Sequence, residues 1–334
     1  MLRVHFTSTD LARTRVMETP DPMWEIVLSV HMLHARYARV EFADWRHRVR
    51  RDLHRHGLAR ATRTLTALAP DGSYFPDFLT PPEGLLGVAD GIEAVVATPV
   101  AQVRRELTIL HERTPTPAWT WEVADRPART DLGRMLHDYH RRAITPYWAT
   151  MCDRAAVDRA ARTRGMRAGG VPALLDSFRP HMRWRPPVLE VDSPVDRDLH
   201  LEGRGITLIP SHFCWNRPVP IANPELPPTL VYPMARDPRW LAPAPPAPAD
   251  HPLARLMGPT RAAILRAAAT GPNTTEIARR LDVSRATVSE HTAVLREAGL
   301  ITSHRHDNNV LHVLTTLGAA LLDHGDDHGD ERGV

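Results

Sequence analysis

The chain has 334 residues with 42 basic and 39 acidic side chains, which gives a formal net charge of +3. This length predicts two or three domains, and the near balance of charge excludes a strongly basic coat for non-specific nucleic-acid binding, although local Arg clusters remain open. Only Cys152 and Cys214 are present, far apart in sequence, which excludes a disulfide framework and a Cys-rich zinc site.

The sequence predicts neither a signal peptide nor a membrane-spanning helix. The first six residues lack the apolar core of a signal peptide, and no apolar run approaches the length of about 18 residues that a membrane-spanning helix needs. We therefore expect an intracellular, cytoplasmic protein with no membrane partner.

The N-terminal region is predicted to be mostly helical. Residues 2–6 favour a short strand, and Ser8 to Asp10 offer caps for a helix that runs through Arg15. A strongly periodic helix starts at Asp21, with Pro22 in the first helical position. Further helical stretches are predicted at 43–68, 91–113, 131–163 and 171–178.

Between residues 184 and 234 the pattern changes to short β-rich runs. They cover residues 187–191, 199–201, 205–209 and 229–232, and Gly203 and Gly205 bracket a tight turn. We predict one small sheet of three or four strands packed on the helices. Residues 238–252 then hold six prolines in fifteen positions, which predicts a semi-rigid linker between domains.

After the linker, three helices are expected in close succession. The first covers residues 253–268 and stops at Gly271 and Pro272. Asn273 with Glu276 three residues later is typical of a capping box for the second helix. Residues 282–284 form a turn, and Ser284 caps a third helix that extends to Ala298.

The third helix has the build of a recognition helix. Val288, Leu295 and a flank of His291 or Thr292 face inward, so short or polar side chains project from the first turns. Such a surface suits the major groove, where Arg can contact guanine and Glu can accept a hydrogen bond from cytosine. Residues 300–306 and 310–314 predict a β-hairpin wing that carries Arg305 near its tip and histidines, including His312, that are solvated or face phosphates.

At this point a family can be recognised. Residues 258–265, Glu276-Ile277-Ala278 and the run from Ser284 to Ile301 resemble the winged helix-turn-helix of ArsR-type bacterial regulators over about residues 253–322. The resemblance implies DNA reading by Ser284 to His291, a wing contact by Arg305, and homodimerisation through the first and last helices. Thr292 stands where the family usually has Leu and Glu290 where it often has a basic residue or His, so the usual base preference does not carry over.

A second resemblance covers about residues 1–235. Residues 6–7, 10–15, 20–25 and 185–190 look like a domain of unknown function that precedes this winged helix in many actinobacterial regulators. No ligand comes with that resemblance. The eight tryptophans, seven of them before the linker, could line an apolar pocket or could belong to the core.

The sequence favours neither a metal site nor a catalytic site. Residues 250–334 contain no Cys, so the soft-metal site of many ArsR-type proteins is absent, and Asp323, His324, Asp327 and His328 lie in a Gly-rich tail that we expect to be disordered. Asp138 with His137 and His140 fits a solvated helix face better than an acid–base cluster. Cys152 and Cys214 fit buried small side chains better than redox switches, and the chain has no common catalytic or nucleotide-binding motif.

The sequence thus predicts an α+β fold with four parts: an N-terminal domain (1–237), a linker (238–252), a winged helix-turn-helix (253–322) and a disordered acidic tail (323–334). We expect a homodimeric, ligand-responsive repressor, not an enzyme, that binds double-stranded DNA at an inverted repeat, needs no cofactor, and answers to a small-molecule effector of unknown identity. An enzyme or protein-interaction domain in the N-terminal part, with the winged helix as a targeting module, is the alternative. The residues predicted to contact DNA are Asn273, Thr274, Ser284, Arg285, Ala286, Thr287, Ser289, Glu290, His291, Arg296 and Arg305.

Overall fold

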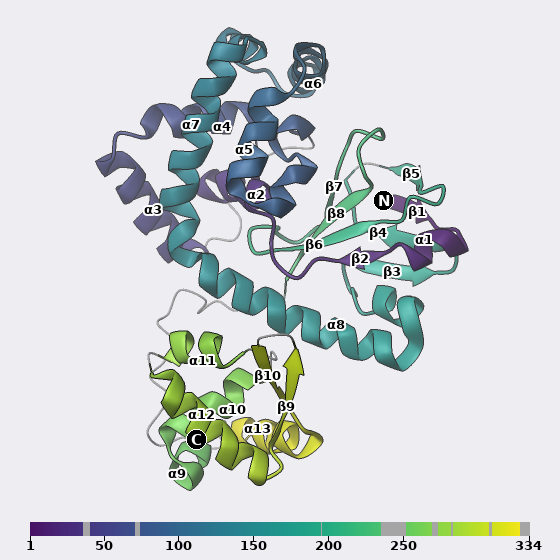
Figure 1. Cartoon of the computed structure of the whole chain (residues 1–334). Helices are drawn as coiled ribbons and strands as arrows, with labels where there is room; N and C mark the ends of the chain where they lie inside the picture. The colour runs from purple at the N-terminus through teal and green to yellow at the C-terminus, as the bar shows by residue number, and fades with distance from the viewer. Residues whose placement is uncertain are drawn as a thin grey trace, which may run out of the picture. The chain divides into compact units, whose positions relative to one another are not determined.

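A computed structural model describes the chain except residues 36–40, 71–73, 195, 235–251, 269–272, 282, 307–308 and 328–334. The side chains of residues 168, 252, 255, 279–280, 304–306, 309, 316 and 323–327 also lie outside the description. The chain forms two compact units, Met1–Leu241 and Ala242–Val334 (Figure 1). Most of the Pro-rich segment predicted as a linker falls in residues 235–251, outside the described residues.

The predicted helix at Asp21 is central to the N-terminal unit. Helix α2 (Pro22–His34) is buried over nearly its whole circumference, and the Asp21 carboxylate accepts hydrogen bonds from the backbone N–H groups of Met23 and Trp24. This is the N-cap that the sequence predicts, with Pro22 in the first turn. A β-carbon on Gly84 would collide with the Asp21 carboxylate, so this position needs glycine.

The other predicted helices are present but are divided at glycine or proline. Residues 43–68 form α3 (Ala43–Arg55) and α4 (Ala59–Leu68), which are separated at Gly57 with a φ of +70°. Pro99 separates α5 (Val88–Ala97) from α6 (Val100–Arg113). Pro146, in a short 3-10 turn, separates α7 (Arg126–Ala143) from α8 (Trp148–Asp176), and α8 is itself kinked at Gly169 and Gly170, ahead of the stretch predicted at 171–178. These breaks follow from the lost N–H of proline and the positive φ of glycine. Short 3-10 helices η1 to η4 cover Asp77–Leu79, Pro82–Leu86, Ala118–Ala124 and Thr145–Tyr147.

The β region forms two four-stranded sheets rather than the single small sheet predicted. One sheet has the order β3 (Met182–Arg185), β4 (Val188–Val191), β1 (Leu2–His5) and β5 (Arg197–His200). The other has the order β2 (Arg15–Val16), β6 (Thr207–Ser211), β8 (Thr229–Pro233) and β7 (Val219–Pro220). Gly203 and Gly205, predicted in a turn, both have a positive φ between β5 and β6.

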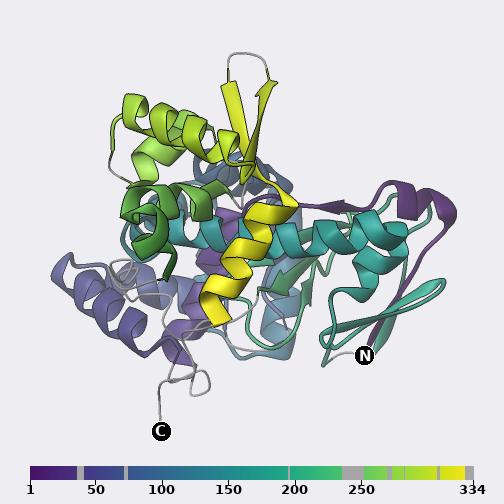
Figure 2. The same cartoon turned by 90° about the horizontal axis from the view of Figure 1, so that it is seen from below.

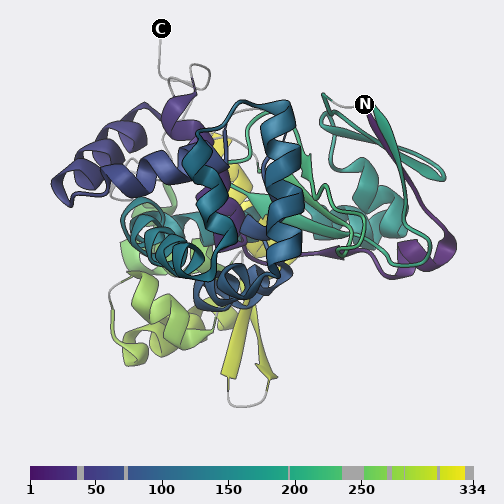
Figure 3. The same cartoon turned by 90° about the horizontal axis from the view of Figure 1, so that it is seen from above.

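The predicted helix through Arg15 is wrong in its second half. Helix α1 (Ser8–Ala12) ends early, and Arg15 begins β2, where it donates its N–H to the carbonyl oxygen of Ile206. The partner strand is almost 200 residues away in sequence, so a local pattern could not reveal this pairing. Two apolar cores result, one centred on the helices from α2 onward and one formed by strands of both sheets with the end of α8. Figure 3 shows the helices and the strands of the N-terminal unit side by side.

The C-terminal unit contains the predicted helices and the predicted hairpin. Its elements are α9 (Pro252–Met257), α10 (Pro259–Ala267), α11 (Thr274–Leu281), α12 (Arg285–Glu297), β9 (Ile301–His306), β10 (Asn309–Leu314) and α13 (Thr316–Asp327). The helix predicted over 253–268 is divided at Gly258, whose φ is +89°. Strands β9 and β10 form an antiparallel hairpin that projects from the helices (Figure 2).

The end of the C-terminal unit differs from the prediction. Residues 323–327, predicted as the start of a disordered tail, extend α13 to Asp327. The helix is held one turn earlier, where Leu321 and Leu322 pack against the apolar core of the unit. Among the described residues, no helix combines the length and apolar character that a membrane span requires.

Candidate nucleic-acid interface and N-terminal cavity

The turn between α11 and α12 is fixed by local hydrogen bonds. The backbone N–H of Val283 donates to the carbonyl oxygen of Ala278, and the Ser284 hydroxyl accepts a 3.0 Å hydrogen bond from the backbone N–H of Thr287. Ser284 is therefore the N-cap of α12, as predicted. At the start of α11, the Asn273 side chain accepts a hydrogen bond from the backbone N–H of Glu276.

Helix α12 has a buried side and an exposed side. Val288, Thr292 and Leu295 are buried, and the Thr292 hydroxyl donates to the carbonyl oxygen of Ser289. This settles the choice left open by the sequence, because Thr292 faces the core while His291 is half-buried. Exposed side chains on the other side are Arg285, Ala286, Ser289, Glu290 and Arg296, and Thr287 is half-buried beside Ser284.

The wing is joined to the start of α11 through His312 on β10. Its Nε2 lies 2.9 Å from the Thr274 hydroxyl and its Nδ1 lies 3.0 Å from the Ser303 hydroxyl. His312 is 3% exposed, so the expectation that it is solvated is wrong, and burial lowers its pKa. An imidazole with a hydroxyl at each nitrogen can be buried at little cost, because both ring nitrogens have hydrogen-bond partners.

The residues predicted to contact DNA thus differ in how accessible their side chains are. The residues of the first two turns of α12 lie on one exposed face of one helix, whereas Thr274 is occupied by its hydrogen bond to His312. Arg305 is paired with Val310 in the hairpin register, but its side chain lies outside the described residues. The DNA contacts of all these side chains stay predictions.

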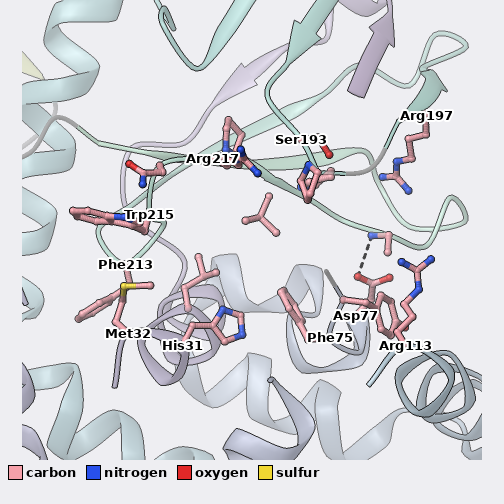
Figure 4. Close-up of a pocket in the computed structure, with 18 residues that line it drawn as sticks. His31, Met32, Phe75, Asp77, Arg113, Ser193, Arg197, Phe213, Trp215 and Arg217 are labelled. Carbon is pink, nitrogen blue, oxygen red and sulfur yellow. Dashed lines mark hydrogen bonds between the residues drawn. The ribbon is translucent and has the colours of Figure 1, made fainter. Parts of the chain in front are cut away.

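The N-terminal unit contains a cavity of about 430 Å³ between α2, the segment 74–77 and the loops that precede β5 and flank β7 (Figure 4). Trp215 lines it, while Trp24 and Trp45 are fully buried in the helical core. Each of the two roles that the sequence left open is therefore filled by some tryptophans, while Trp119 and Trp121 are exposed and do not line this cavity. The volume lies within the range of about 300–1,000 Å³ that is typical of small-molecule sites.

Neither the two cysteines nor the cluster of His137, Asp138 and His140 on α7 has the features of a reactive group. Burial raises the pKa of Cys152 to about 11 and raises that of the buried Cys214 further, so neither thiol favours its reactive thiolate form. Asp138 forms an ion pair with Arg141 on an exposed helix face, and burial lowers the pKa of His140 to about 4. No cluster of three or more His, Cys, Asp or Glu suited to a metal ion occurs in the described part of the chain.

A family model described as a helix-turn-helix domain matches residues 256–304. This segment extends from α9 through α12 into β9, so it includes the capped turn and the exposed face described above. The C-terminal unit therefore contains a helix-turn-helix domain, a fold of DNA-binding proteins that points to transcription regulation. Comparison with curated proteins and with solved structures gives no match.

Proposed function

We propose that this protein is a one-component transcription regulator of the ArsR type, a homodimer that represses transcription from an inverted-repeat operator and responds to a small molecule bound by its N-terminal unit. The observation that carries the proposal is the exposed N-terminal face of α12, capped by Ser284 and followed by a β-hairpin. In helix-turn-helix proteins this helix lies in the major groove and its N-terminal residues contact base edges.

The chemistry of that face supports sequence-specific reading. Ala286 and Ser289 are short enough to allow close approach to the base edges. Arg285 can donate two hydrogen bonds to the O6 and N7 atoms of guanine, and Glu290 can accept one from the N4 amino group of cytosine. The Ser284 and Thr287 hydroxyls are engaged with each other at 2.8 Å, which fits a helix start that is ordered before it meets DNA.

Homodimerisation is supported by the first and last helices of the C-terminal unit. Helices α9 and α13 lie against each other through Leu253, Leu321 and Leu322. Leu256 on α9 is 74% exposed and Leu317 on α13 is 60% exposed, although both are large apolar side chains. A second copy would remove these side chains from water and would place two copies of α12 for the two half-sites of a palindrome.

We assign ligand binding, rather than catalysis, to the N-terminal unit. Asp77 is the one carboxylate among the described residues that line the cavity, and its two oxygens accept hydrogen bonds from the backbone N–H groups of Ala222 and Asn223. A carboxylate held in this way positions the loop and is poorly placed to act as a general base. This supports ligand binding rather than catalysis in the N-terminal unit. We propose in addition that the regulator is cytoplasmic and works without a cofactor.

Fluorescence anisotropy of the full-length protein tests the DNA-binding part. Duplexes enriched by repeated selection from a random pool should contain an inverted repeat with half-sites about one helical turn apart. The selected duplex should bind at least about tenfold more tightly than a shuffled one at the same salt concentration. Equal affinities with equal salt dependence would contradict the proposal.

Sedimentation equilibrium tests the dimer. Leu256→Glu and Leu317→Glu should each convert the dimer to a monomer at micromolar concentration, because a buried carboxylate at an interface is costly. Val313→Glu is the matched control, since Val313 is 40% exposed on the wing of the same unit and should leave the dimer intact. A dimer that survives both leucine substitutions would show that another surface holds the copies together.

A further inference from the structure

The cavity of the N-terminal unit has an apolar end. Phe213 and Trp215, from the loop after β6, lie with Met32 of α2 at the left end of the cavity in Figure 4. His31 and Phe75 line the lower side of the cavity in the same view. The Phe75 ring lies 5.8 Å from the His31 ring. A flat apolar group would exchange water for aromatic and aliphatic surface at this end.

The opposite end is cationic. Arg113 from the last turn of α6 and Arg197 from β5 approach Asp77 there (Figure 4), and Arg217 lies on the wall between the two ends. Three arginines therefore line the cavity with one carboxylate, Asp77, and Arg217 also forms a 3.3 Å ion pair with Asp192, which does not line the cavity. Each arginine carries a full charge at neutral pH, and a guanidinium matches a carboxylate with two parallel hydrogen bonds.

The arginines are held in place by neighbours that leave donors available. Arg197 donates one hydrogen bond of 3.1 Å to the carbonyl oxygen of Ile221, and Arg113 lies over the Tyr74 ring at 5.7 Å. Burial lowers the pKa of Arg197, Asp77 opposes that change, and the neighbouring Arg113 adds to it. A partly buried cation beside a second cation gains free energy when an anion binds between them.

Two buried carboxylates shape the cavity walls. Glu25 on α2 accepts hydrogen bonds from the backbone N–H groups of His212 and Phe213, and so fixes the start of the aromatic loop. Asp77 fixes residues 222 and 223 in the same way. The walls are thus tied to rigid elements, which reduces the entropy cost of ordering them around a ligand.

We propose that this cavity binds a small aromatic carboxylate, with the ring between Phe75, Phe213 and Trp215 and the carboxylate between Arg113 and Arg197. The inference rests on the proposed sensor function and names the chemical class of its ligand. The order of the two ends fixes the orientation of the molecule: the ring lies toward α2 and the charged group toward the end of α6. A neutral molecule of the same shape accepts only weaker hydrogen bonds from the arginine pair, and a cationic one is repelled by it.

Isothermal titration calorimetry of the full-length protein without DNA tests the ligand class. The probes are benzoate, phenylacetate and 1-naphthoate, each paired with its uncharged primary amide. We expect at least one carboxylate to bind with one site per chain, and its amide to bind at least tenfold more weakly. Failure of all three acids to bind at 10 mM, or equal affinity of acid and amide, would overturn the proposal.

Substitutions locate the site. Arg113→Gln and Arg197→Gln should each weaken binding of the acid at least tenfold, because each removes a charge-assisted hydrogen bond. Arg104→Gln is the matched control, since Arg104 is exposed on the same helix as Arg113 and does not line the cavity. Trp215→Phe should remove most of the ligand-induced change in tryptophan fluorescence while the affinity changes less than threefold. Unchanged affinity in both arginine variants would overturn the assignment.

The same samples separate this inference from the proposed function. If the acid binds but leaves the affinity for the selected duplex unchanged, the ligand class stands and the sensor role fails. If the protein binds the duplex specifically but none of the acids, the DNA-binding proposal stands and the ligand class fails. If the acid binds and changes duplex affinity at least tenfold, both stand, because the ligand then favours one DNA-binding state over the other.

Discussion

The two units of this protein differ in how far apart in sequence their functional residues lie. In the C-terminal unit, the capped turn, the exposed face of α12 and the hairpin come from about 40 consecutive residues, and each is fixed by hydrogen bonds between near neighbours. In the N-terminal unit, the cavity is assembled from α2, α6 and loops around β5 to β7, more than 180 residues apart. Local motifs therefore define the helix-turn-helix, whereas long-range pairing defines the cavity.

The largest effect should come from breaking the core of one unit while sparing the other. Leu295 is 2% exposed in the C-terminal core, so Leu295→Ala should destabilise that unit by about 2–5 kcal/mol and abolish DNA binding. Calorimetric melting should show the transition of the C-terminal unit at a lower temperature and that of the N-terminal unit unchanged.

Val294→Ala is the control for this variant, because Val294 is the neighbouring residue on the same helix and is 39% exposed. It should leave both transitions in place. Equal shifts of both transitions in Leu295→Ala would show that the two units unfold as one, and would remove the contrast between them.

The N-terminal unit should respond to pH through Asp21 at the start of α2. Burial raises the pKa of Asp21 to about 7, against the opposing hydrogen bonds from Trp24 and Met23. The folded state then holds a proton that the unfolded state has released, so this contribution to stability is full below about pH 4 and is lost as the pH rises through about 7. We expect this contribution to lower the melting temperature of the unit most clearly above about pH 7, because the buried His140 and His212, whose pKa values burial lowers, act in the opposite direction below that pH.

Asp21→Asn keeps an oxygen acceptor for the helix cap and removes the buried charge. It should reduce the pH dependence, leaving the part due to Glu25, whose pKa burial also raises to about 7, and should stabilise the unit by on the order of 2–4 kcal/mol at pH 8. Glu93→Gln on the exposed face of α5 is the control and should retain the wild-type slope. A pH dependence of Asp21→Asn equal to that of the wild type would contradict the assignment.

A smaller effect should separate base reading from backbone contact within the C-terminal unit. Arg285→Ala should lose about 1–3 kcal/mol of preference at one base position, because a bidentate contact to guanine is specific. Arg305→Ala on the wing should weaken all duplexes by a similar factor. Binding of both variants to a library of single-base variants of the selected duplex measures this, and identical specificity profiles would refute the division of roles.

The smallest effect concerns the helix cap. Ser284→Ala removes the acceptor for the backbone N–H of Thr287 and should destabilise the C-terminal unit by about 1 kcal/mol. Ser289→Ala changes an exposed serine five residues later and should leave thermal stability unchanged. If the two variants melt at the same temperature, the Ser284 hydroxyl does not stabilise α12.

The features that the sequence predicts correctly are local, and those that it misses depend on contacts between distant parts of the chain. Ser284, Asn273 and Asp21 are caps whose partners lie two or three residues away, so their roles follow from local spacing. The strand at Arg15 was predicted as helix because its partner, Ile206, is far along the chain. His312 was predicted to be solvated because nothing local shows that Thr274 and Ser303 enclose its ring.

The cavity could not be predicted for the same reason. The sequence indicated that some tryptophans could line a pocket, but not that Trp215 does so while Trp24 and Trp45 are core. Arg113 and Arg197 belong to no recognisable sequence motif, and only the fold brings them close to Asp77. Residues that line a cavity but come from several helices, strands and loops show no regular spacing in the sequence.

The most direct test of the account compares two glutamates placed at different points along α12. Ser289 lies on the N-terminal face proposed to enter the major groove, and Val294 is exposed five residues nearer the C-terminal end of the helix. Both substitutions add one negative charge, so they differ chiefly in how far that charge lies from the N-terminal turns that contact base edges. We expect Ser289→Glu to weaken binding of the selected duplex at least 100-fold and Val294→Glu to change it less than threefold, measured by fluorescence anisotropy at one salt concentration. Equal losses in the two variants, or no loss in Ser289→Glu, would contradict the central claim that this face of α12 reads DNA.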